Sequence, residues 1–98
     1  MEFKFKIEPQ VYQEIQEVID FYNEKRIGFG RKFWNEINYN FKLIRKNPYF
    51  QIRYANVRCV PLRKFPFMIH YTLDEKKEEI IIRSVINTYK NPKTTWIS

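Results

Sequence analysis

Two amphipathic segments separated by a short glycine turn are the feature that most limits how this chain can fold. Apolar side chains recur at three- and four-residue steps within residues 11–22 and again within residues 29–44. This spacing predicts two helices, each with one apolar face. Pro9 suits the first turn of the first helix, and the Asn-Pro pair at 47–48 ends the second. Because only the turn around residues 27–30 separates them, the helices are expected to pack as a helical hairpin.

Segments with a period-two pattern lie before and after this predicted hairpin. Aromatic and aliphatic residues alternate with charged ones over 3–7, and an alternating pattern returns at 57–62 and 67–73. Residues 80–86 are nearly continuously apolar, which is typical of a central strand covered on both faces. Residues 49–56 show neither pattern and are expected to be an irregular connection.

The order of these segments predicts an α+β fold with the succession β-α-α-β-β-β. A small, twisted antiparallel sheet is expected to carry the helical hairpin on one face. The first strand is expected to insert beside a later one and to complete a four-stranded sheet. With 98 residues, of which 44% are hydrophobic, the chain is expected to form a single domain over residues 1–98.

Features that would direct the chain out of the cytoplasm are not found in the sequence. Its single cysteine, Cys59, cannot form an intramolecular disulfide, so no oxidising compartment is needed. No segment approaches the roughly 18 apolar residues of a membrane span, and the N-terminus lacks the continuous apolar run of a signal peptide. A cytoplasmic location is therefore predicted.

Positive charge is concentrated in the second half of the chain. The formal net charge is +7; residues 1–50 hold nine Lys and Arg against seven Asp and Glu, or +2, whereas residues 51–98 hold nine against four, or +5. The second half is therefore the better candidate for meeting a polyanion or an acidic partner. The alternative is a basic surface that only keeps the domain soluble.

The sequence offers few residues for conventional enzyme chemistry. One histidine, His70, excludes a multi-histidine metal site, and one cysteine excludes a zinc cluster. His70 is expected to face outward or to fill a polar gap in the sheet, and Cys59 is expected to be a small core residue. No glycine-rich phosphate loop is found. No metal and no cofactor are therefore predicted.

Cations on or beside the predicted sheet remain as candidates for binding phosphates or acidic side chains. Arg58 and Arg83 stand within strands, where an unpaired charge must face solvent or a partner. Such a cluster could stabilise phosphoryl charge without a metal, or pair with glutamates of a binding protein. For Arg63 and Lys64, in a turn, simple solvation is the alternative. The full set is Arg53, Arg58, Arg63, Lys64, Arg83, Lys90 and Lys93.

Aromatic side chains outside the apolar stripes are candidates for a protein interface. Trp34 and Tyr39 lie off the main stripe of the second helix, and Phe21 lies at the edge of the first. Together they predict an aromatic helical face that binds another protein. Trp96, near the C-terminus, either packs the tail or contacts a partner.

Five segments, in order along essentially the whole chain, carry a family resemblance. They read I-x-F-Y-N-E-K-R-I-G-F-G-R-K-F at 19–33, I-R-K-N-P at 44–48, N-V-R at 56–58, K-F-P-F-M-I-H-Y at 64–71 and N-P-K-T-T-W at 91–96. These segments resemble the ParE-like branch of the ParE/RelE toxin superfamily, whose members are often described as plasmid stabilisation proteins. The resemblance implies a small antiparallel sheet with a helical hairpin on one side. It also implies a bacterial type II toxin, neutralised by a cognate antitoxin whose C-terminal segment wraps over it.

The resemblance allows two kinds of cellular target. RelE-like members cut mRNA in the ribosomal A site with basic residues and a tyrosine or histidine, without a metal, whereas ParE-like members inhibit DNA gyrase. Met68 stands where RelE-type nucleases carry an arginine, and Asn87 stands where many ParE-like relatives have a histidine. Gyrase inhibition is the implied function. One alternative is a degenerate toxin that retains only antitoxin binding; the other is a ribosome-dependent mRNA endonuclease, with the candidate catalytic residues Arg58, Arg83, Tyr89 and Lys90.

Partner contacts are predicted from this resemblance together with the charge pattern. The antitoxin segment is expected to be acidic and amphipathic, and operator DNA is expected to be reached only through the antitoxin. The predicted antitoxin contacts are Phe21, Trp34, Tyr39, Arg58 and Arg83. The predicted contacts with gyrase, or alternatively with the ribosome and its mRNA, are Arg58, Arg63, Lys64, Arg83, Lys90, Lys93 and Trp96.

Overall fold

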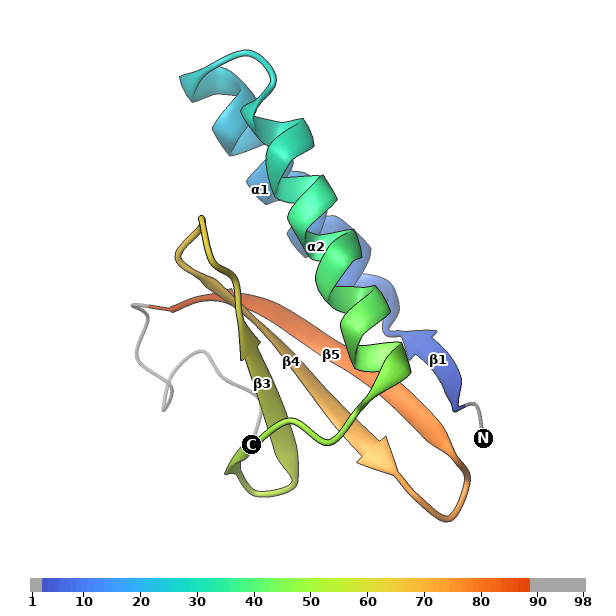
Figure 1. The fold of residues 1–98 in the computed structure, drawn as a ribbon. Helices are drawn as coiled ribbons and strands as arrows, with labels where there is room; N and C mark the ends of the chain where they lie inside the picture. Colours follow the sequence, from blue (N-terminus) through green and yellow to red (C-terminus); the bar gives the residue numbers. More distant parts are fainter. Residues whose placement is uncertain (1–2, 89–98) are drawn as a thin grey trace.

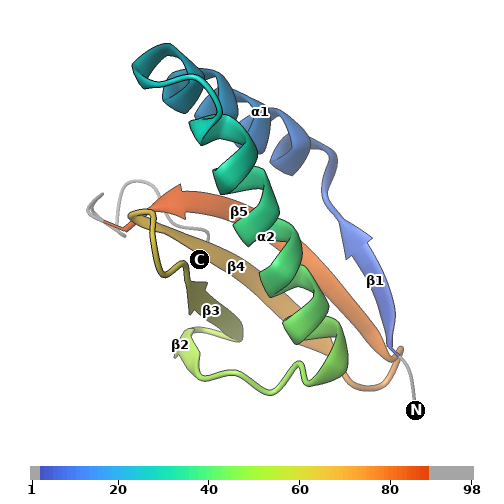
Figure 2. The ribbon, with the colours of Figure 1, turned by 45° about the horizontal axis from the view of Figure 1, so that its top comes forward.

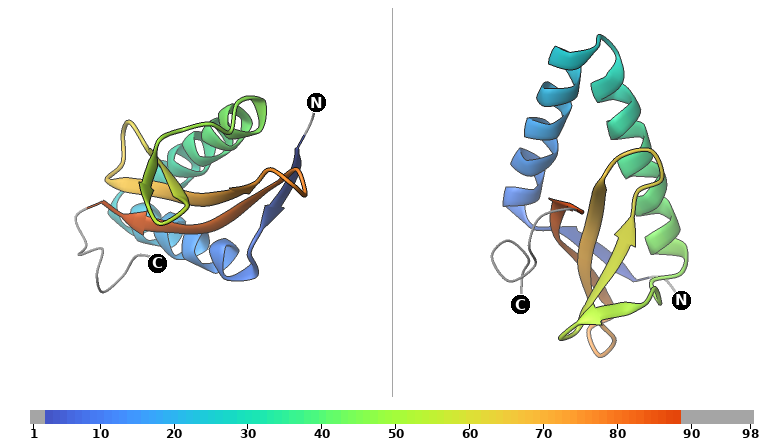
Figure 3. Two further views of the ribbon diagram at one scale, coloured as in Figure 1. Left: turned by 90° about the horizontal axis from the view of Figure 1, so that it is seen from below. Right: turned by 90° about the vertical axis from the view of Figure 1, so that its left-hand side faces the viewer.

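Two long helices lie side by side across one face of a twisted five-stranded sheet in the computed structural model, which describes residues 3–88 (Figure 1). The order of helices and strands confirms the α+β fold expected from the sequence. Figure 3 shows both helices on the same side of the sheet. The elements are β1 (Lys4–Ile7), α1 (Pro9–Lys25), α2 (Phe29–Lys46), β2 (Ile52–Tyr54), β3 (Val57–Pro61), β4 (Phe67–Asp74) and β5 (Glu79–Asn87).

The helical hairpin forms where the two apolar stripes predicted it. α1 begins at Pro9, and a short turn joins it to α2. Gly28, in this turn, has a φ of 91°, in the left-handed region that favours glycine. Gly30 lies where the helices approach closely, since a Cβ there would be 2.7 Å from the carbonyl oxygen of Ile19. Neither described helix is long and apolar enough to cross a membrane.

The strands are arranged in the order β1-β5-β4-β3-β2. β3, β4 and β5 form the expected antiparallel meander, and β5 lies between β1 and β4 as an interior strand. β1 pairs with β5 in parallel (Figure 2), and Lys4 lies opposite Glu79. The expectation of an entirely antiparallel sheet is therefore wrong. Strands joined by a tight turn must be antiparallel, but the long path through the hairpin leaves the direction of β1 unconstrained.

A fifth strand, β2, lies in the segment that was expected to be irregular. It pairs antiparallel with β3, with Ile52 opposite Arg58, and Ala55 in the turn between the strands has a φ of 46°. The described residues therefore form five strands, and the expectation of four is wrong. A strand of three residues is too short to show an alternating pattern, which explains why the sequence does not reveal it.

A β-bulge interrupts the pairing of β4 with β5. Tyr71 lies opposite Ile82, whereas the preceding residue, His70, lies opposite Ser84. Arg83 is therefore an extra residue in β5 with no residue directly opposite. The bulge at Arg83 shifts the alternation of side chains along the rest of β5 by one position.

The first half of α1 binds the part of the β5 edge that β1 leaves unpaired. The Gln10 side chain donates a hydrogen bond to the carbonyl oxygen of Arg83 at 3.0 Å. The Glu14 carboxylate accepts hydrogen bonds from the Val85 backbone N–H at 3.0 Å and from the Ser84 hydroxyl at 3.0 Å. Polar side chains of a helix thus take the place of a longer neighbouring strand.

The hydrophobic core lies between the hairpin and the sheet. Its helical members belong to the two apolar stripes, which confirms the predicted faces of both helices. Tyr71 is fully buried in this core, where its hydroxyl donates a 2.6 Å hydrogen bond to the Pro48 carbonyl oxygen. The buried residues are Val11, Ile15, Phe33, Ile37, Phe41, Ile44, Val60, Leu62, Phe65, Ile69, Tyr71, Ile80, Ile82 and Val85.

Candidate interaction site

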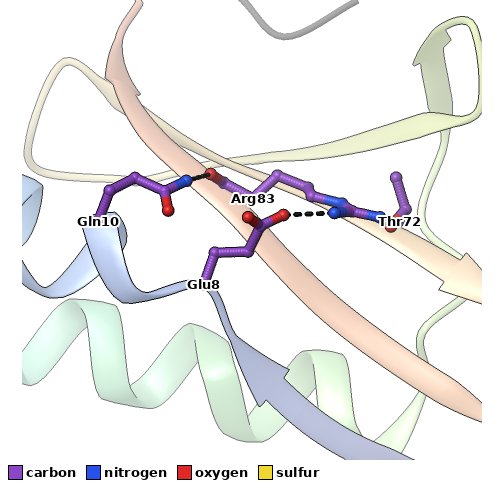
Figure 4. Close-up of polar contacts among 4 residues, drawn as sticks. All are labelled: Glu8, Gln10, Thr72 and Arg83. Atoms are coloured by element: carbon purple, nitrogen blue, oxygen red, sulfur yellow. Dashed lines mark hydrogen bonds and ion pairs between the residues drawn. The ribbon is translucent and has the colours of Figure 1, made fainter.

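Arg83, the bulged residue of β5, is engaged by three neighbours (Figure 4). Its guanidinium forms an ion pair with Glu8, which lies between β1 and α1, and its Nε donates to the Thr72 hydroxyl at 3.0 Å. Gln10 binds its carbonyl oxygen. The side chains of Arg83 and Glu8 are each 33% exposed. A partly exposed ion pair adds little stability, but it offsets the arginine charge within the chain.

Arg58 of β3 lies on the helix-facing side of the sheet, because it is paired with the buried Tyr71. Its Nη1 donates a 2.7 Å hydrogen bond to the Phe50 carbonyl oxygen, and its guanidinium lies 5.6 Å from the centre of the Tyr49 ring. Both partners belong to the connection between α2 and β2. Arg58 therefore holds this connection against the sheet.

The two strand arginines lie on opposite faces of the sheet. Arg58 shares a face with Tyr71, whereas Arg83 binds Thr72, and consecutive residues of a strand point to opposite faces. The expectation that both arginines belong to one cluster of cations is therefore wrong. Strand alternation explains the separation, because Arg83 directly follows Ile82, which lies opposite Tyr71 on the face of Arg58.

Arg63 and Lys64 lie in the turn between β3 and β4, and this turn is attached to α2. Their backbone N–H groups donate to the Glu36 carboxylate, with a distance of 3.3 Å between Lys64 N and Glu36 Oε1. The contact uses the backbone, so both residues remain exposed. Arg53, on the edge strand β2, is exposed as well. The predicted contacts Tyr89, Lys90, Lys93 and Trp96 lie outside the described residues.

The three aromatic side chains expected at the surface are exposed, but they do not share one surface. Phe21 is 50% exposed, Trp34 39% and Tyr39 56%. Phe21 lines a hollow between α1 and the end of β5, Trp34 a groove of about 970 Å³ between α1 and α2, and Tyr39 a groove between α2 and β3. The expected single aromatic face is therefore wrong, because these side chains point in different directions around the hairpin.

The groove beside Tyr39, here named the α2–β3 groove, combines apolar and basic side chains. Its volume is about 750 Å³. Glu36 also lines it, but the backbone N–H groups of the β3–β4 turn already occupy that carboxylate. Apart from Tyr39, the lining includes the apolar Leu43, Phe50 and Val60 and the basic Lys32, Arg63 and Lys64. These residues come from separate segments of the chain, so no sequence pattern indicates the groove. Its apolar and basic lining suits an amphipathic segment with acidic side chains.

His70 fills a polar gap on the sheet, as expected. Its Nδ1 lies 3.1 Å from the Tyr54 hydroxyl and 3.4 Å from Cys59 Sγ. Burial lowers the pKa of His70 to about 4 and raises the pKa of Cys59 to about 11. A nucleophilic cysteine requires a lowered thiol pKa, so the arrangement agrees with structural roles for both. The described residues contain no group of three or more His, Cys, Asp and Glu side chains that could hold a metal ion.

A solved structure from the chromosomal ParDE TA system of P. aeruginosa is similar to this fold. The TM-score is 0.75 at 16% sequence identity, and the match covers 87% of this chain and 95% of that chain. No protein-family model and no curated protein matches the sequence. Similarity at this identity concerns the fold. The protein has a ParE-like fold, which confirms the architecture that the sequence resemblance implied.

Proposed function

We propose that this protein is the toxin of a bacterial type II toxin–antitoxin system, which a cognate antitoxin holds inactive in the cytoplasm. The observation that carries the proposal is the ParE-like fold, which extends over 87% of the chain in the match to a member of a ParDE TA system. The five segments that resemble ParE-like toxins add support from individual residues.

In this proposal the α2–β3 groove receives the antitoxin. Its apolar lining, the exposed ring of Tyr39 and the surrounding cations favour an acidic amphipathic segment. A segment that wraps further around the hairpin reaches Phe21 and Trp34 in the neighbouring hollows. Arg58 and Arg83 contribute less, because residues of the same chain already hold both guanidinium groups.

An antitoxin peptide at saturating concentration should raise the melting temperature of the protein, because it binds only the folded form. Tyr39→Ala should weaken peptide binding by about tenfold or more, as expected for an aromatic anchor in a groove. Tyr49→Ala is the matched control, since Tyr49 is equally exposed at 55% and does not line the grooves of Tyr39, Trp34 or Phe21. No shift in melting temperature would refute antitoxin binding, and equal losses in the two variants would refute the assignment of the groove.

For the target, we infer DNA gyrase. Metal-independent RNA cleavage requires several side chains gathered around one phosphate. Arg58 and Arg83 lie on opposite faces of the sheet, which supports a toxin that does not cut RNA. The competing hypothesis of a ribosome-dependent endonuclease depends on Tyr89 and Lys90, outside the described residues. A degenerate toxin that only binds its antitoxin is the remaining alternative.

Induced expression of the chain alone in a bacterial host separates these hypotheses. Gyrase poisoning predicts growth arrest with intact bulk mRNA and an induced DNA-damage response, and the purified protein should inhibit gyrase supercoiling. Codon-linked mRNA cleavage on ribosomes, abolished by Arg83→Ala, would overturn the gyrase proposal. Normal growth together with antitoxin binding would identify a degenerate toxin.

A further inference from the structure

The turn between α1 and α2 carries a cluster of positive charge. The hairpin tip, defined as residues 21–32, has four cations against the single carboxylate of Glu24, or +4 − 1 = +3. It projects beyond the sheet (Figure 1, Figure 3). None of its cations forms an ion pair with a described residue. These cations are Lys25, Arg26, Arg31 and Lys32.

Three of the four cations form cation–π contacts with aromatic rings. Lys25 Nζ lies 5.2 Å from the centre of the Phe21 ring. Arg26 and Lys32 each lie 5.2 Å from the centre of the Phe29 ring. Cation–π contacts of this kind limit the movement of the charged groups. Charges held at set positions suit the regularly spaced phosphates of a duplex better than mobile lipid headgroups.

The apex of the hairpin tip is a single aliphatic side chain. Ile27 is 96% exposed. One such side chain is too little apolar surface for a membrane anchor, whereas minor-groove binders insert single apolar side chains between base steps. The N-terminus of α2 also lies at the tip and has no acidic residue in its first turn; the Asn23 Oδ1 accepts a hydrogen bond from the Gly30 N–H there at 2.9 Å. The partial positive charge of this helix end therefore adds to that of the cations.

We propose that the hairpin tip is a contact site for duplex DNA, in which its cations bind phosphates on both sides of the minor groove and Ile27 enters the groove. Recognition of this kind is independent of sequence, because it reads the phosphate backbone and the deformability of the duplex. Of the hairpin tip, only Lys32 also lines the α2–β3 groove, so an antitoxin confined to that groove leaves Lys25, Arg26 and Ile27 accessible. The DNA contact does not depend on whether gyrase is the target.

The charge part of the proposal is tested by fluorescence anisotropy with the full chain and a labelled duplex of about 20 base pairs. Neutralising four phosphates predicts that affinity falls on the order of 100-fold between about 50 and 200 mM salt. Replacing Lys25 and Arg31 together by Gln should reduce the slope of log affinity against log salt by about 2. Replacing Lys76 and Lys77 by Gln removes the same charge from the β4–β5 turn and should leave the slope nearly unchanged. Equal effects of the two pairs would overturn the proposal, because binding would then follow overall charge.

The apolar part is tested with Ile27→Ser in the same assay. This variant should weaken binding several-fold without changing the salt slope, because an apolar contact releases no counterions. A duplex with 2-aminopurine should gain fluorescence with the unaltered chain, from local unstacking, and not with Ile27→Ser. An unchanged affinity and the same fluorescence gain with Ile27→Ser would overturn the insertion of Ile27. Circular dichroism of each variant checks that the fold is retained.

Anionic membranes are the competing ligand. Co-sedimentation measures binding of the full chain to vesicles of phosphatidylserine and phosphatidylcholine. The result is compared with duplex binding at the same salt concentration. Binding to the duplex that exceeds binding to the vesicles supports the DNA contact. Binding to vesicles that Ile27→Ser abolishes, without binding to the duplex, would overturn it.

Discussion

The sheet and the hairpin tip hold their positive charges in opposite ways. In the sheet, Lys6 binds Glu79 at 2.8 Å, Arg83 pairs with Glu8, and Arg58 is held by a backbone carbonyl group. At the hairpin tip, three of the four cations contact aromatic rings, and none forms an ion pair with a described residue. Net charge alone therefore does not locate a binding surface. Charges already offset within the chain stabilise the fold, and the others are available to partners.

The largest contrast between the two regions is expected from truncating one apolar side chain in each. Phe33 is fully buried beside the rings of Tyr22, Phe65 and Phe67. Phe33→Ala should lower the free energy of unfolding by about 3–5 kcal/mol, because it leaves a cavity. Ile27→Ala, at the hairpin tip, should change it by less than about 0.5 kcal/mol. Urea denaturation of both variants measures the difference, and similar losses would show that the tip is part of the core.

An intermediate effect is expected from pH, through the buried imidazole of the sheet. Burial lowers the pKa of His70 from 6.5 to about 4, so between these pH values the unfolded chain binds more protons than the folded one. The free energy of unfolding should therefore decrease as the pH falls from about 6.5 to about 4, by roughly 3 kcal/mol in total.

Urea denaturation at a series of pH values tests this effect of His70. His70→Asn should remove most of the decrease, because asparagine does not titrate in this range. Lys25→Gln, at the hairpin tip, is the control and should keep the pH dependence of the unaltered chain. A decrease that persists in His70→Asn would mean that other groups cause it.

The smallest effect is expected from breaking the ion pair that offsets the charge of Arg83. Glu8→Gln should lower the free energy of unfolding by about 0.5–1 kcal/mol, because both partners are partly exposed. Glu17→Gln, which removes a carboxylate from the exposed side of α1, is the matched control. Thermal denaturation of the two variants at one pH gives the comparison. If Glu8→Gln lowers the free energy of unfolding no more than Glu17→Gln does, the ion pair does not offset the charge of Arg83. The cations of the sheet and of the hairpin tip would then be alike.

The helical hairpin could be predicted from the sequence because it depends on local spacing. The apolar stripes of both helices mark residues such as Val11, Phe33 and Ile44, and all three are fully buried. The two glycines of the turn are explained locally as well. Gly28 has a left-handed backbone conformation, and Gly30 lies where α1 approaches α2 closely. Patterns of period 3.6 and of period two are local, so the elements that they specify are readable from residues alone.

The missed features depend on contacts between residues that are distant in the sequence. The parallel pairing of β1 with β5 follows a long connection that leaves its direction unconstrained. The opposite placement of Arg58 and Arg83 depends on which residues of β3, β4 and β5 lie opposite one another. The α2–β3 groove joins residues from α2 and β3 with the turn that follows. Neither leaves a periodic signal. The exposure of Tyr39 was predictable from its place off the stripe, but the groove beside it was not.

The polar contacts of α1 with β5 have a consequence for the solubility of the free protein. Because Gln10 and Glu14 occupy the unpaired half of that strand's edge, the open edges of the described sheet are those of β1 and β2, with four and three residues. Both are short and carry exposed cations, among them Lys4 and Arg53. Short, charged edges resist the addition of strands from other molecules. The protein is therefore expected to stay dispersed in solution rather than to grow into cross-β fibres.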